Sequence, residues 1–326
     1  MPHQASAEHE EDGPLVSVIV PCFNHAKSVR RAVESALRSN YPHIEVVVLD
    51  DGSADDPGAA LVELLPDPRV RLLRRDHAGS NRARSRAIEE SSGEYITFLD
   101  ADDTMEPGRL DAQLALARAH GPRILVFCSS RILHRGRLHS TKTPPVSPHA
   151  TDVTDAFASM LFRPNSATLL IARSFYDELG GFDPIYRHLE THFQLRAMAA
   201  GARVLSAPDV LYHVHRDGRS LSTRSHGEDM ARFISEVDTA GRTPDASPML
   251  RKYCRMRQRV NALHLLSCGP EDRRIVLSAF HRTKPNVWAR VGLFVLIAIT
   301  PYLGQDRKLF FARWINSAVG LWTKWR

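Results

Sequence analysis

The sequence predicts an α/β fold in which a mostly parallel sheet is flanked by helices and followed by a helical C-terminal extension. Three observations support this prediction. Apolar runs rich in Val, Ile and Leu alternate with segments of helical periodicity over the first 130 residues. These runs are continuously apolar, as is typical of parallel strands buried on both faces. From about residue 225 onward, helical patterns replace the alternation.

The elements of the first half are bounded by turn and cap residues. Pro21 stops the first apolar run, Asp56 and Pro57 open a short helix, and Gly93 and Gly121 close two longer ones. Strands are expected over residues 15–24, 43–53, 70–75, 94–100 and 123–130. Helices are expected over residues 28–39, 55–65, 80–93 and 107–121.

The pattern loosens in the second half. Residues 131–150 are Pro-rich and basic, and we expect a mobile loop there. Further helices are expected over residues 151–162, 173–183, 190–201 and 247–269, with strands over residues 166–172 and 202–208. The predicted organisation is a disordered acidic tail (1–13), one domain of two halves (about 14–130 and about 131–224), and a basic helical extension (225–326).

Composition narrows the class of protein. The chain has 326 residues, 43% of them hydrophobic and 25% charged, which indicates a globular protein with a full core. The four cysteines form no CxxC pair, which favours a reducing compartment and argues against a disulfide framework or a zinc site. The N-terminus has neither a basic start nor an apolar segment, so it does not read as a secretory signal. We therefore expect a cytoplasmic protein.

Charge is distributed unevenly along the chain. Residues 247–326 contain 15 Lys and Arg against 3 Asp and Glu, whereas residues 1–246 contain 28 against 34. The apolar run at residues 291–300 is shorter than the roughly 20 residues that span a bilayer, so a core helix is the simpler interpretation. Residues 307–326 mix Trp and Phe with Arg and Lys, which favours an anionic membrane surface over a docked core helix or nucleic acid. The protein could thus be peripheral at the inner face of the cytoplasmic membrane.

Carboxylates are concentrated where two predicted strands end. Asp50 and Asp51 end the second strand, and Asp100 and Asp102 follow the fourth. We expect the two pairs to converge, because ligands of parallel sheets bind where the carboxyl ends of the strands meet. A hard divalent cation held by one or two carboxylates and by phosphate oxygens would suit Asp102. The alternative is that Asp102 and Asp103 cap the helix that follows.

Five motifs occur in the order and spacing of the family 2 glycosyltransferases. They read "VSVIVPCFN", "VVVLDDGSADD", "HAGSNRARSRAI", "GEYITFLDADD" and "ELGGFDPIYRHLETHFQLRAMAAG". The sequence therefore resembles that family over residues 15–223, about two-thirds of the chain. The resemblance implies the GT-A fold, a Rossmann-like sheet flanked by helices, and a nucleoside diphosphate sugar as the donor.

The resemblance also implies a nucleotide site. In the family, the loop after the first strand and the "DDGS" turn hold the nucleoside, and these positions carry over to Pro21, Phe23, Asn24, Asp50 and Asp51. A carboxylate there could accept from a pyrimidine imide and select uracil or thymine.

A second family stretch appears here as "HAGSNRARS". Gly79 and Arg84 match it, while His77 and Ser85 replace the two family asparagines. The resemblance assigns Arg84 to the nucleotide. The alternative is that the arginines of this helix form only a solvated basic face.

The family's DxD motif corresponds to Asp100, Ala101 and Asp102. By resemblance, Asp102 would bind Mn²⁺ or Mg²⁺ on the diphosphate, and Asp100 would contact the ribose or position the metal. His215, in "LYHVHRDGRSLS", is at the place of a family histidine that reaches the diphosphate or metal. Gly181, in "GGFD", would shape the sugar and acceptor pocket, since glycine permits close backbone approach.

The family's catalytic base is the Asp of an "ED" pair that precedes an Arg. Counting back from Arg196 places Glu190 at the Asp position and Leu189 at the first Glu position. Glu190 is the candidate general base. It could instead be only a helix N-terminal charge, and His188 and His192 are the further candidates.

The prediction for function is an inverting, metal-dependent glycosyltransferase that moves one sugar from a UDP- or dTDP-type donor to an acceptor hydroxyl. A cell-envelope glycan or lipid-linked saccharide would suit the basic, aromatic C-terminus. No QxxRW motif of the processive synthases is present. The alternatives are a catalytically inactive sugar-nucleotide-binding module and a nucleotidyltransferase, although "PCFNHAKS" is not the Gly-rich basic loop that the latter needs.

Overall fold

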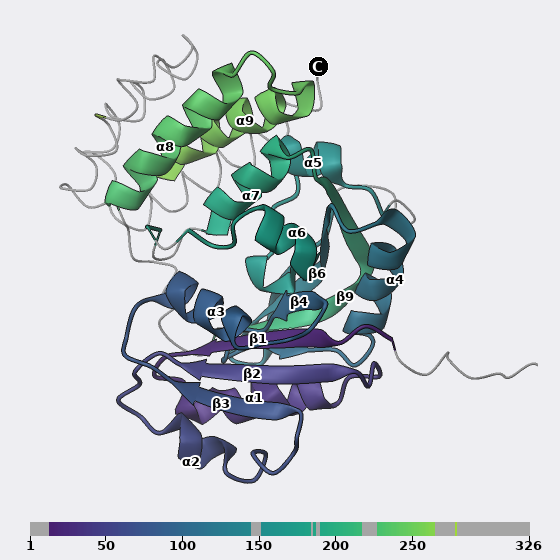
Figure 1. Ribbon diagram of the computed structural model, residues 1–326, viewed down its shortest axis with the longest axis vertical. Helices are drawn as coiled ribbons and strands as arrows, with labels where there is room; N and C mark the ends of the chain where they lie inside the picture. Colours follow the sequence, from purple (N-terminus) through teal and green to yellow (C-terminus); the bar gives the residue numbers. More distant parts are fainter. Residues whose placement is uncertain are drawn as a thin grey trace, which may run out of the picture. The chain divides into compact units, whose positions relative to one another are not determined.

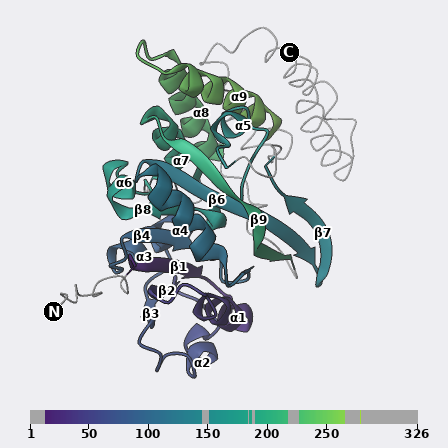
Figure 2. The ribbon, with the colours of Figure 1, turned by 90° about the vertical axis from the view of Figure 1, so that its right-hand side faces the viewer.

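The computed structural model describes residues 13–144, 151–183, 185–186, 190–216, 227–264 and 278 (Figures 1 and 2). The chain divides into two compact units. Unit 1 comprises Met1–Thr143, Pro164–His188 and Leu205–Asp217. Unit 2 comprises Pro144–Arg163, Leu189–Val204 and Gly218–Arg326. The domain boundary predicted at residue 224 lies outside the described residues and stays a prediction.

Unit 1 begins with a parallel sheet. Its strands are β1 (Val16–Cys22), β2 (Ile44–Asp50), β3 (Val70–Arg74) and β4 (Tyr95–Phe98), in the spatial order β3-β2-β1-β4. All three neighbouring pairs are parallel, as their continuously apolar sequences predict. The connecting helices are α1 (Ala26–Leu37), α2 (Pro57–Leu61) and α3 (Ser80–Glu89). Helices α1 and α3 both pack on β1.

Beyond β4 the sheet becomes antiparallel. It continues through β8 (Leu170–Ala172), β6 (Ile124–His134), β9 (Arg203–Arg216) and β5 (Thr104–Met105). Strand β8 runs antiparallel to β4 and to β6, and β5 runs antiparallel to β9. The helices here are α4 (Arg109–His120), α6 (Arg173–Glu178) and the short 3₁₀ turn η1 (Ser166–Thr168). The predicted α/β class with parallel strands is thus confirmed.

The mobile loop predicted over residues 131–150 is wrong for its first part. Strand β6 continues to His134, turns at Arg135 and Gly136, and returns as β7 (Arg137–Lys142). Both turn residues have positive φ, 48° and 74°, which is the backbone of a two-residue hairpin turn. Arginine is an unusual residue for such a position, so the sequence carries little turn signal. Residues 145–150 lie outside the described residues.

Unit 2 contributes helices α5 (Thr154–Ala158), α7 (Glu190–Ala199), α8 (Gly227–Arg242) and α9 (Pro248–His264). Phe157 of α5 stacks on Tyr253 of α9 at 5.7 Å between ring centroids, and His192 of α7 contacts Glu236 of α8 at 2.7 Å. The predicted helical extension is confirmed over its described part. The apolar run at 291–300 and the aromatic segment at 307–326 lie outside it. Within the described residues, none of the helices is both long enough and apolar enough to span a membrane.

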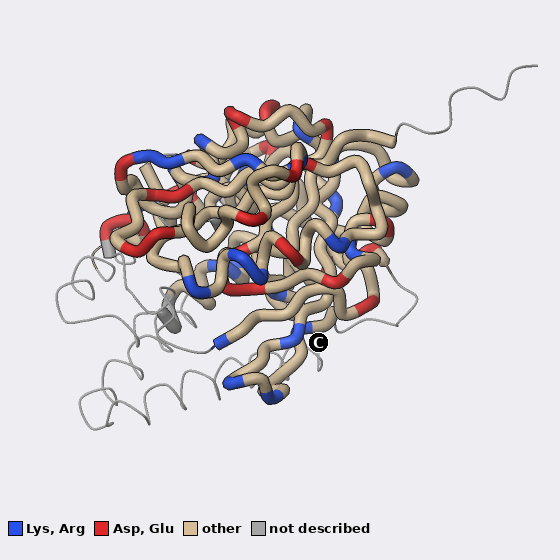
Figure 3. The backbone as a smooth tube through the Cα atoms, turned by 90° about the horizontal axis from the view of Figure 1, so that it is seen from below, with Lys and Arg blue, Asp and Glu red and all other residues tan. Residues whose placement is uncertain are grey.

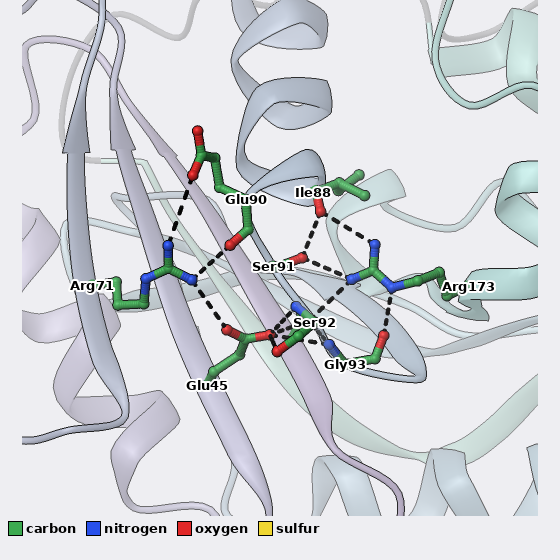
Figure 4. A network of polar contacts seen from close by, with 9 residues as sticks. Glu45, Arg71, Ile88, Glu90, Ser91, Ser92, Gly93 and Arg173 are labelled. Carbon is green, nitrogen blue, oxygen red and sulfur yellow. Dashed lines mark hydrogen bonds and ion pairs between the residues drawn. The ribbon is translucent and has the colours of Figure 1, made fainter.

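A polar network joins the amino ends of the strands, opposite the predicted site (Figure 4). Glu45, near the start of β2, accepts hydrogen bonds from the Ser17 hydroxyl at 2.8 Å and from the backbone N–H groups of Ser92 and Gly93 at 2.6 and 3.0 Å. Arg173 donates to the Gly93 carbonyl at 2.6 Å. These bonds fix the entry into β4 and satisfy buried backbone groups.

Candidate active site

Three strand ends meet at one edge of the parallel sheet. Strand β1 lies between β2 and β4, so the two acidic pairs flank β1 and are not on adjacent strands. Cys22 pairs with Asp50 in the β1–β2 register, and Ile19 pairs with Phe98 in the β1–β4 register. The Asp51 N–H continues the pattern by donating to the Cys22 carbonyl at 2.8 Å. The predicted residues of the three loops therefore share this edge, with Pro21, Phe23, Asn24, Asp50, Asp51, Asp100, Ala101 and Asp102 among them.

Asp51 fastens the loop before α3. Its buried carboxylate accepts from the backbone N–H groups of Ala78 and Gly79, both at 2.9 Å, and lies 2.9 Å from His77 Nδ1. The His77 ring stacks on Phe23 with centroids 4.1 Å apart. Gly79 has a φ of 94°, which a side chain would strain. Asp51 and the backbone around Gly79 thus form one side of the candidate site. His77, which replaces a family asparagine, stacks on Phe23 beside them.

Asp50 and Asn24 organise the turn after β2. Asp50 accepts from the Ser53 N–H at 2.8 Å, and the Ser53 hydroxyl accepts from the Asn24 N–H at 2.9 Å. The Asn24 side chain accepts from the Ala54 N–H at 2.8 Å. Asn24 has a φ of 58°, a conformation that asparagine tolerates better than most residues. The first and second strand ends are therefore hydrogen-bonded into one rigid corner.

Arg84 faces the DxD segment. Its guanidinium contacts the Asp100 carboxylate at 3.0 Å, and only 8% of its side chain is exposed. Arg82, two residues earlier in α3, is exposed. The alternative that the arginines of α3 form only a solvent-exposed basic surface is therefore wrong for Arg84, which is buried against Asp100. It agrees with the exposure of Arg82.

Negative charge accumulates at this edge. Burial, followed by the charge of Asp100, raises the pKa of the Asp102 carboxyl. Burial raises the pKa of the Cys22 thiol to about 12, with Asp50, Asp55 and Asp102 adding to the shift. An anionic ligand such as a diphosphate would be repelled by these carboxylates unless a cation lay beside it.

Asp103 does not cap a helix. Helix α4 begins six residues later at Arg109, and its N-cap Gly108 offers no side chain. Asp103 instead accepts from the backbone N–H of His215 at 3.0 Å, and it hydrogen-bonds with the Tyr212 hydroxyl. Burial, then the charges of Asp100 and Asp102, raise the pKa of Asp103 to about 8. The cap hypothesis is wrong because Asp103 joins the DxD loop to β9.

His215 lies close to the DxD loop through this connection. Strand β5 pairs with β9 through Thr104 opposite His213, and His215 Nε2 lies 3.0 Å from the Thr104 hydroxyl. The imidazole therefore lies beside the acidic loop, with one ring nitrogen held by a threonine hydroxyl. The contacts of His215 described here are with Thr104 and Asp103, and the shared role of His215 and Asp102 at a metal stays a prediction.

A buried arginine supports the loop from behind. Arg109 is fully buried and donates to the Phe98 carbonyl, the Thr97 hydroxyl and the Ala167 carbonyl at 2.8–3.0 Å. Its guanidinium also lies over the Tyr212 ring, 5.2 Å from the centroid. Arg109 lies in none of the motifs, and Tyr212 lies in the stretch "LYHVHRDGRSLS" that pointed to His215, but no signal in the sequence assigns a role to either.

Two further residues beside Asp102 were also missed. Arg31 of α1 donates to the Asp102 carbonyl at 2.8 Å, and the charge of His25 lowers the pKa of Asp102 in part. Both belong to the segment that follows "PCFN", so their place after the first strand is the signal that could have found them.

The predicted base lies in a different part of the fold. Glu190 is the first residue of α7, in unit 2, whereas every nucleotide- and metal-site residue predicted belongs to unit 1. The side chain of Glu190 and residues 187–189, which include His188 and Leu189, lie outside what the structure describes. His192, the other candidate, is buried and contacts Glu236, so a structural role explains its position. Gly181 has a φ of 62° and lies against the Tyr176 ring, so a larger residue would be strained there.

The donor chemistry of the site fits a hard divalent cation. No group of three or more His, Cys, Asp and Glu close enough to hold a metal occurs among the residues whose placement is described. Mg²⁺ is usually bound by one or two carboxylates and completes its shell with water and substrate phosphates. Asp102, with Asp100 beside it and His215 on the facing strand, provides such an incomplete set.

The parallel sheet with carboxylates at its strand ends defines the GT-A glycosyltransferase fold. Residues 17–175, just under half of the chain, match "Glycosyl transferase family 2", and this part of the chain is similar to the glycosyltransferases of that family. The succinoglycan biosynthesis protein ExoO of Rhizobium meliloti is 44% identical over 114 residues, which are 35% of this chain and 32% of that protein. The present chain thus spans about a third of ExoO.

Solved structures share the fold. A crystal structure of residues 1–349 of S. aureus TarS, in complex with UDP-GlcNAc, aligns over 82% of this chain and 80% of that one, with a TM-score of 0.66 and 18% identity. The mannosyltransferase PcManGT of Pyrobaculum calidifontis, in complex with GDP-Man and Mn²⁺, aligns over 96% and 89%, with a TM-score of 0.58 and 21% identity. At these identities the likeness establishes the fold.

Proposed function

We propose that this protein is an inverting, metal-dependent glycosyltransferase that moves one sugar from a UDP- or dTDP-type sugar nucleotide to an acceptor hydroxyl. The observation that supports it most is the meeting of three strand ends, where buried Asp51 holds the loop before α3, buried Asp50 holds the turn after β2, and Arg84 contacts Asp100. The match of residues 17–175 to the glycosyltransferase family and the TarS complex with UDP-GlcNAc support the choice of a sugar nucleotide as donor.

The nucleoside would lie between Phe23 and the turn built by Asp50, where Asp51 holds the loop in place. Asp102 and His215 would hold Mn²⁺ or Mg²⁺, which supplies neutralisation of the negative charge that builds up on the departing diphosphate. The Mn²⁺ complex of PcManGT supports this cofactor class. Arg84 and Asp100 would orient the ribose and the diphosphate beside it.

Glu190 would act as the general base. Its carboxylate would take the proton of the acceptor hydroxyl as the oxygen attacks the anomeric carbon, opposite the bond to the diphosphate. That bond breaks as the new one forms, so the configuration inverts. Gly181 would shape the sugar and acceptor pocket through its backbone, which at a φ of 62° packs against Tyr176 in a way that a larger residue would not allow.

The acceptor would be a cell-envelope glycan or a lipid-linked saccharide, reached at the cytoplasmic side of the membrane. The role of ExoO in succinoglycan biosynthesis supports a polysaccharide context. The basic, aromatic segment at 307–326 would contact the anionic membrane surface, in keeping with the charge of the C-terminal part of the chain.

The test uses purified full-length protein, Mn²⁺ and a panel of sugar nucleotides. We expect slow hydrolysis of one donor; turnover and binding that are absent with every donor would contradict an enzyme, and binding with no turnover would indicate an inactive binding module. Asp102→Ala should abolish metal-dependent nucleotide binding. Glu190→Gln should retain binding and stop transfer, and full activity of that variant would show that another group is the base.

A further inference from the structure

The β6–β7 hairpin carries positive charge without acidic neighbours in sequence. Residues 123–151 contain five Lys and Arg and no Asp or Glu. Arg131, Arg135 and Arg137 are exposed, and none of the three takes part in an ion pair or a side-chain hydrogen bond within the described part of the chain. In Figure 3 a hairpin with blue and no red residues extends at the lower edge, and Figure 2 shows β7 beside β6 at the margin of the sheet. Three cations are therefore available to an external anion.

The same hairpin exposes an apolar pair. Leu133 and Leu138 face each other across the two strands, and 61% of Leu138 is exposed. Ile132, the neighbour of Leu133, is 5% exposed and points into the fold. Because side chains alternate along a strand, Leu133 and Leu138 lie on the outward face. An irregularity in the pairing at this point leaves the two leucines together near the tip.

The turn of the hairpin places Arg135 in a strained backbone conformation. Arg135 has a φ of 48°, and the described residues contain two other non-glycine positions of positive φ, Asn24 and Met160. Asparagine and glycine adopt this conformation with less strain than arginine does. The tip of the hairpin therefore combines an arginine that strains the turn, a second arginine at Arg137, and an exposed leucine.

We propose that this hairpin docks on an anionic phospholipid surface, with Arg135 and Arg137 at the lipid phosphates and Leu138 inserted between the headgroups. Cations next to an exposed apolar side chain are the composition of interfacial membrane contacts. Protection of an edge strand against aggregation would also explain the charges, but it gains nothing from the exposed side chain of Leu138 beside the half-buried Leu133. A polyanionic glycan would pair with the arginines and would leave the leucines without a role.

The hairpin belongs to the same sheet as the candidate site, since β6 pairs with β8 and lies beside β9. Docking would therefore hold unit 1, with its nucleotide residues, at the lipid surface. The benefit to a lipid-linked acceptor rests on the proposed function, whereas the docking itself does not. It is also separate from the C-terminal segment at 307–326.

Flotation of the full-length chain with vesicles tests the proposal. Vesicles of phosphatidylcholine alone are compared with an equimolar mixture of phosphatidylcholine and phosphatidylglycerol. We expect binding to the anionic vesicles that falls with salt, and a roughly tenfold or greater loss of apparent affinity in R135N/R137Q. The control R38Q/R255Q removes two other exposed arginines and should retain affinity. Equal affinity of the hairpin variant and the unmodified protein would overturn the proposal.

The apolar contact has a matched control of its own. Leu138→Ser should weaken binding to anionic vesicles, whereas Val62→Ser, at a position with 62% exposure, should not. Heparin supplies the rival outcome: if R135N/R137Q weakens heparin binding while Leu138→Ser leaves vesicle binding intact, the surface recognises a polyanionic glycan and the lipid proposal fails. Sugar-nucleotide hydrolysis, measured on the same variants without vesicles, should not change, so failure of docking is distinguishable from failure of the enzyme.

Discussion

The phenolic oxygen of Tyr212 accepts a hydrogen bond from the backbone N–H of Asp100 at 3.1 Å. The same hydroxyl contacts the Asp103 carboxyl, and the ring lies under the Arg109 guanidinium. One side chain of β9 therefore holds both ends of the acidic loop, between a buried cation and two aspartates. The position of Asp102 depends on this support, because the loop has no helix cap to fix it.

Removal of this hydroxyl should weaken the site without unfolding the protein. Tyr212→Phe is expected to lower Mn²⁺-dependent UDP binding by roughly tenfold, the equivalent of about one hydrogen bond. Titration calorimetry measures the affinity. Tyr253→Phe is the matched control, since the Tyr253 hydroxyl is buried in unit 2 and has no hydrogen-bond partner among the residues that the structure describes. That control should retain affinity and gain stability, and an equal loss in both variants would contradict the assignment.

Arg84 and Arg82 offer a second comparison within one helix. Arg84→Gln removes the contact with Asp100, so UDP affinity should fall by between about ten- and a hundredfold, as for a hydrogen bond to a charged group. Arg82→Gln changes an exposed side chain and should leave affinity within a factor of about two. Equal effects of the two substitutions on UDP affinity would mean that only the basic face matters.

Gly93 and Gly108 differ in the space available to a methyl group. A Cβ at Gly93 would lie 2.5 Å from the Ser17 N and 2.8 Å from the Leu15 carbonyl oxygen. A Cβ at Gly108 would have no neighbouring atom of the described residues within 4 Å. Gly93→Ala should lower the free energy of unfolding by about 2 kcal/mol or more, because backbone must move. Gly108→Ala should be neutral or stabilising. Urea denaturation measures both.

Glu45 tests whether the opposite end of the sheet affects only stability. Glu45→Ala removes the acceptor of the Ser92 N–H and of the Ser17 hydroxyl, while the Gly93 N–H keeps the Ser17 hydroxyl oxygen at 2.9 Å; we expect a loss of about 1–3 kcal/mol in urea denaturation. UDP affinity of the folded protein should remain unchanged, because the network lies at the amino ends of the strands (Figure 4). A loss of UDP affinity at unchanged stability would contradict this separation.

The parallel half of the fold could be predicted because β1 and β2 are buried along almost their whole length, and because α2 begins at the Asp56 cap and α3 follows Gly79. The hairpin after Ser130 could not, because its turn uses Arg135 in a conformation typical of asparagine or glycine. Strand β9 was expected to end near residue 208 but continues to Arg216. Its polar and charged later residues pair with β5, a tertiary contact that local pattern does not reveal.

The candidate site divides in the same way. Motif spacing found Asp51, Gly79, Arg84 and Asp100, which the structure brings into contact or onto one edge. It could not find Tyr212 or Arg109, since their role comes from packing behind the loop and not from a recurring pattern. The role of Glu190 as the base stays a prediction.

Strand β9 lies between β6 and β5 in the sheet, although more than 60 residues separate it in sequence from the end of β6. A shortened form of the protein that stops where the family match stops, at residue 175, would lack this strand. Strand β6 of this fragment would then expose unpaired backbone donors and acceptors along one edge, which promotes aggregation. The acidic loop would lose its hydrogen bonds to Tyr212 and His215 of β9. Expression of a smaller fragment for crystallisation should therefore retain the chain through Arg216.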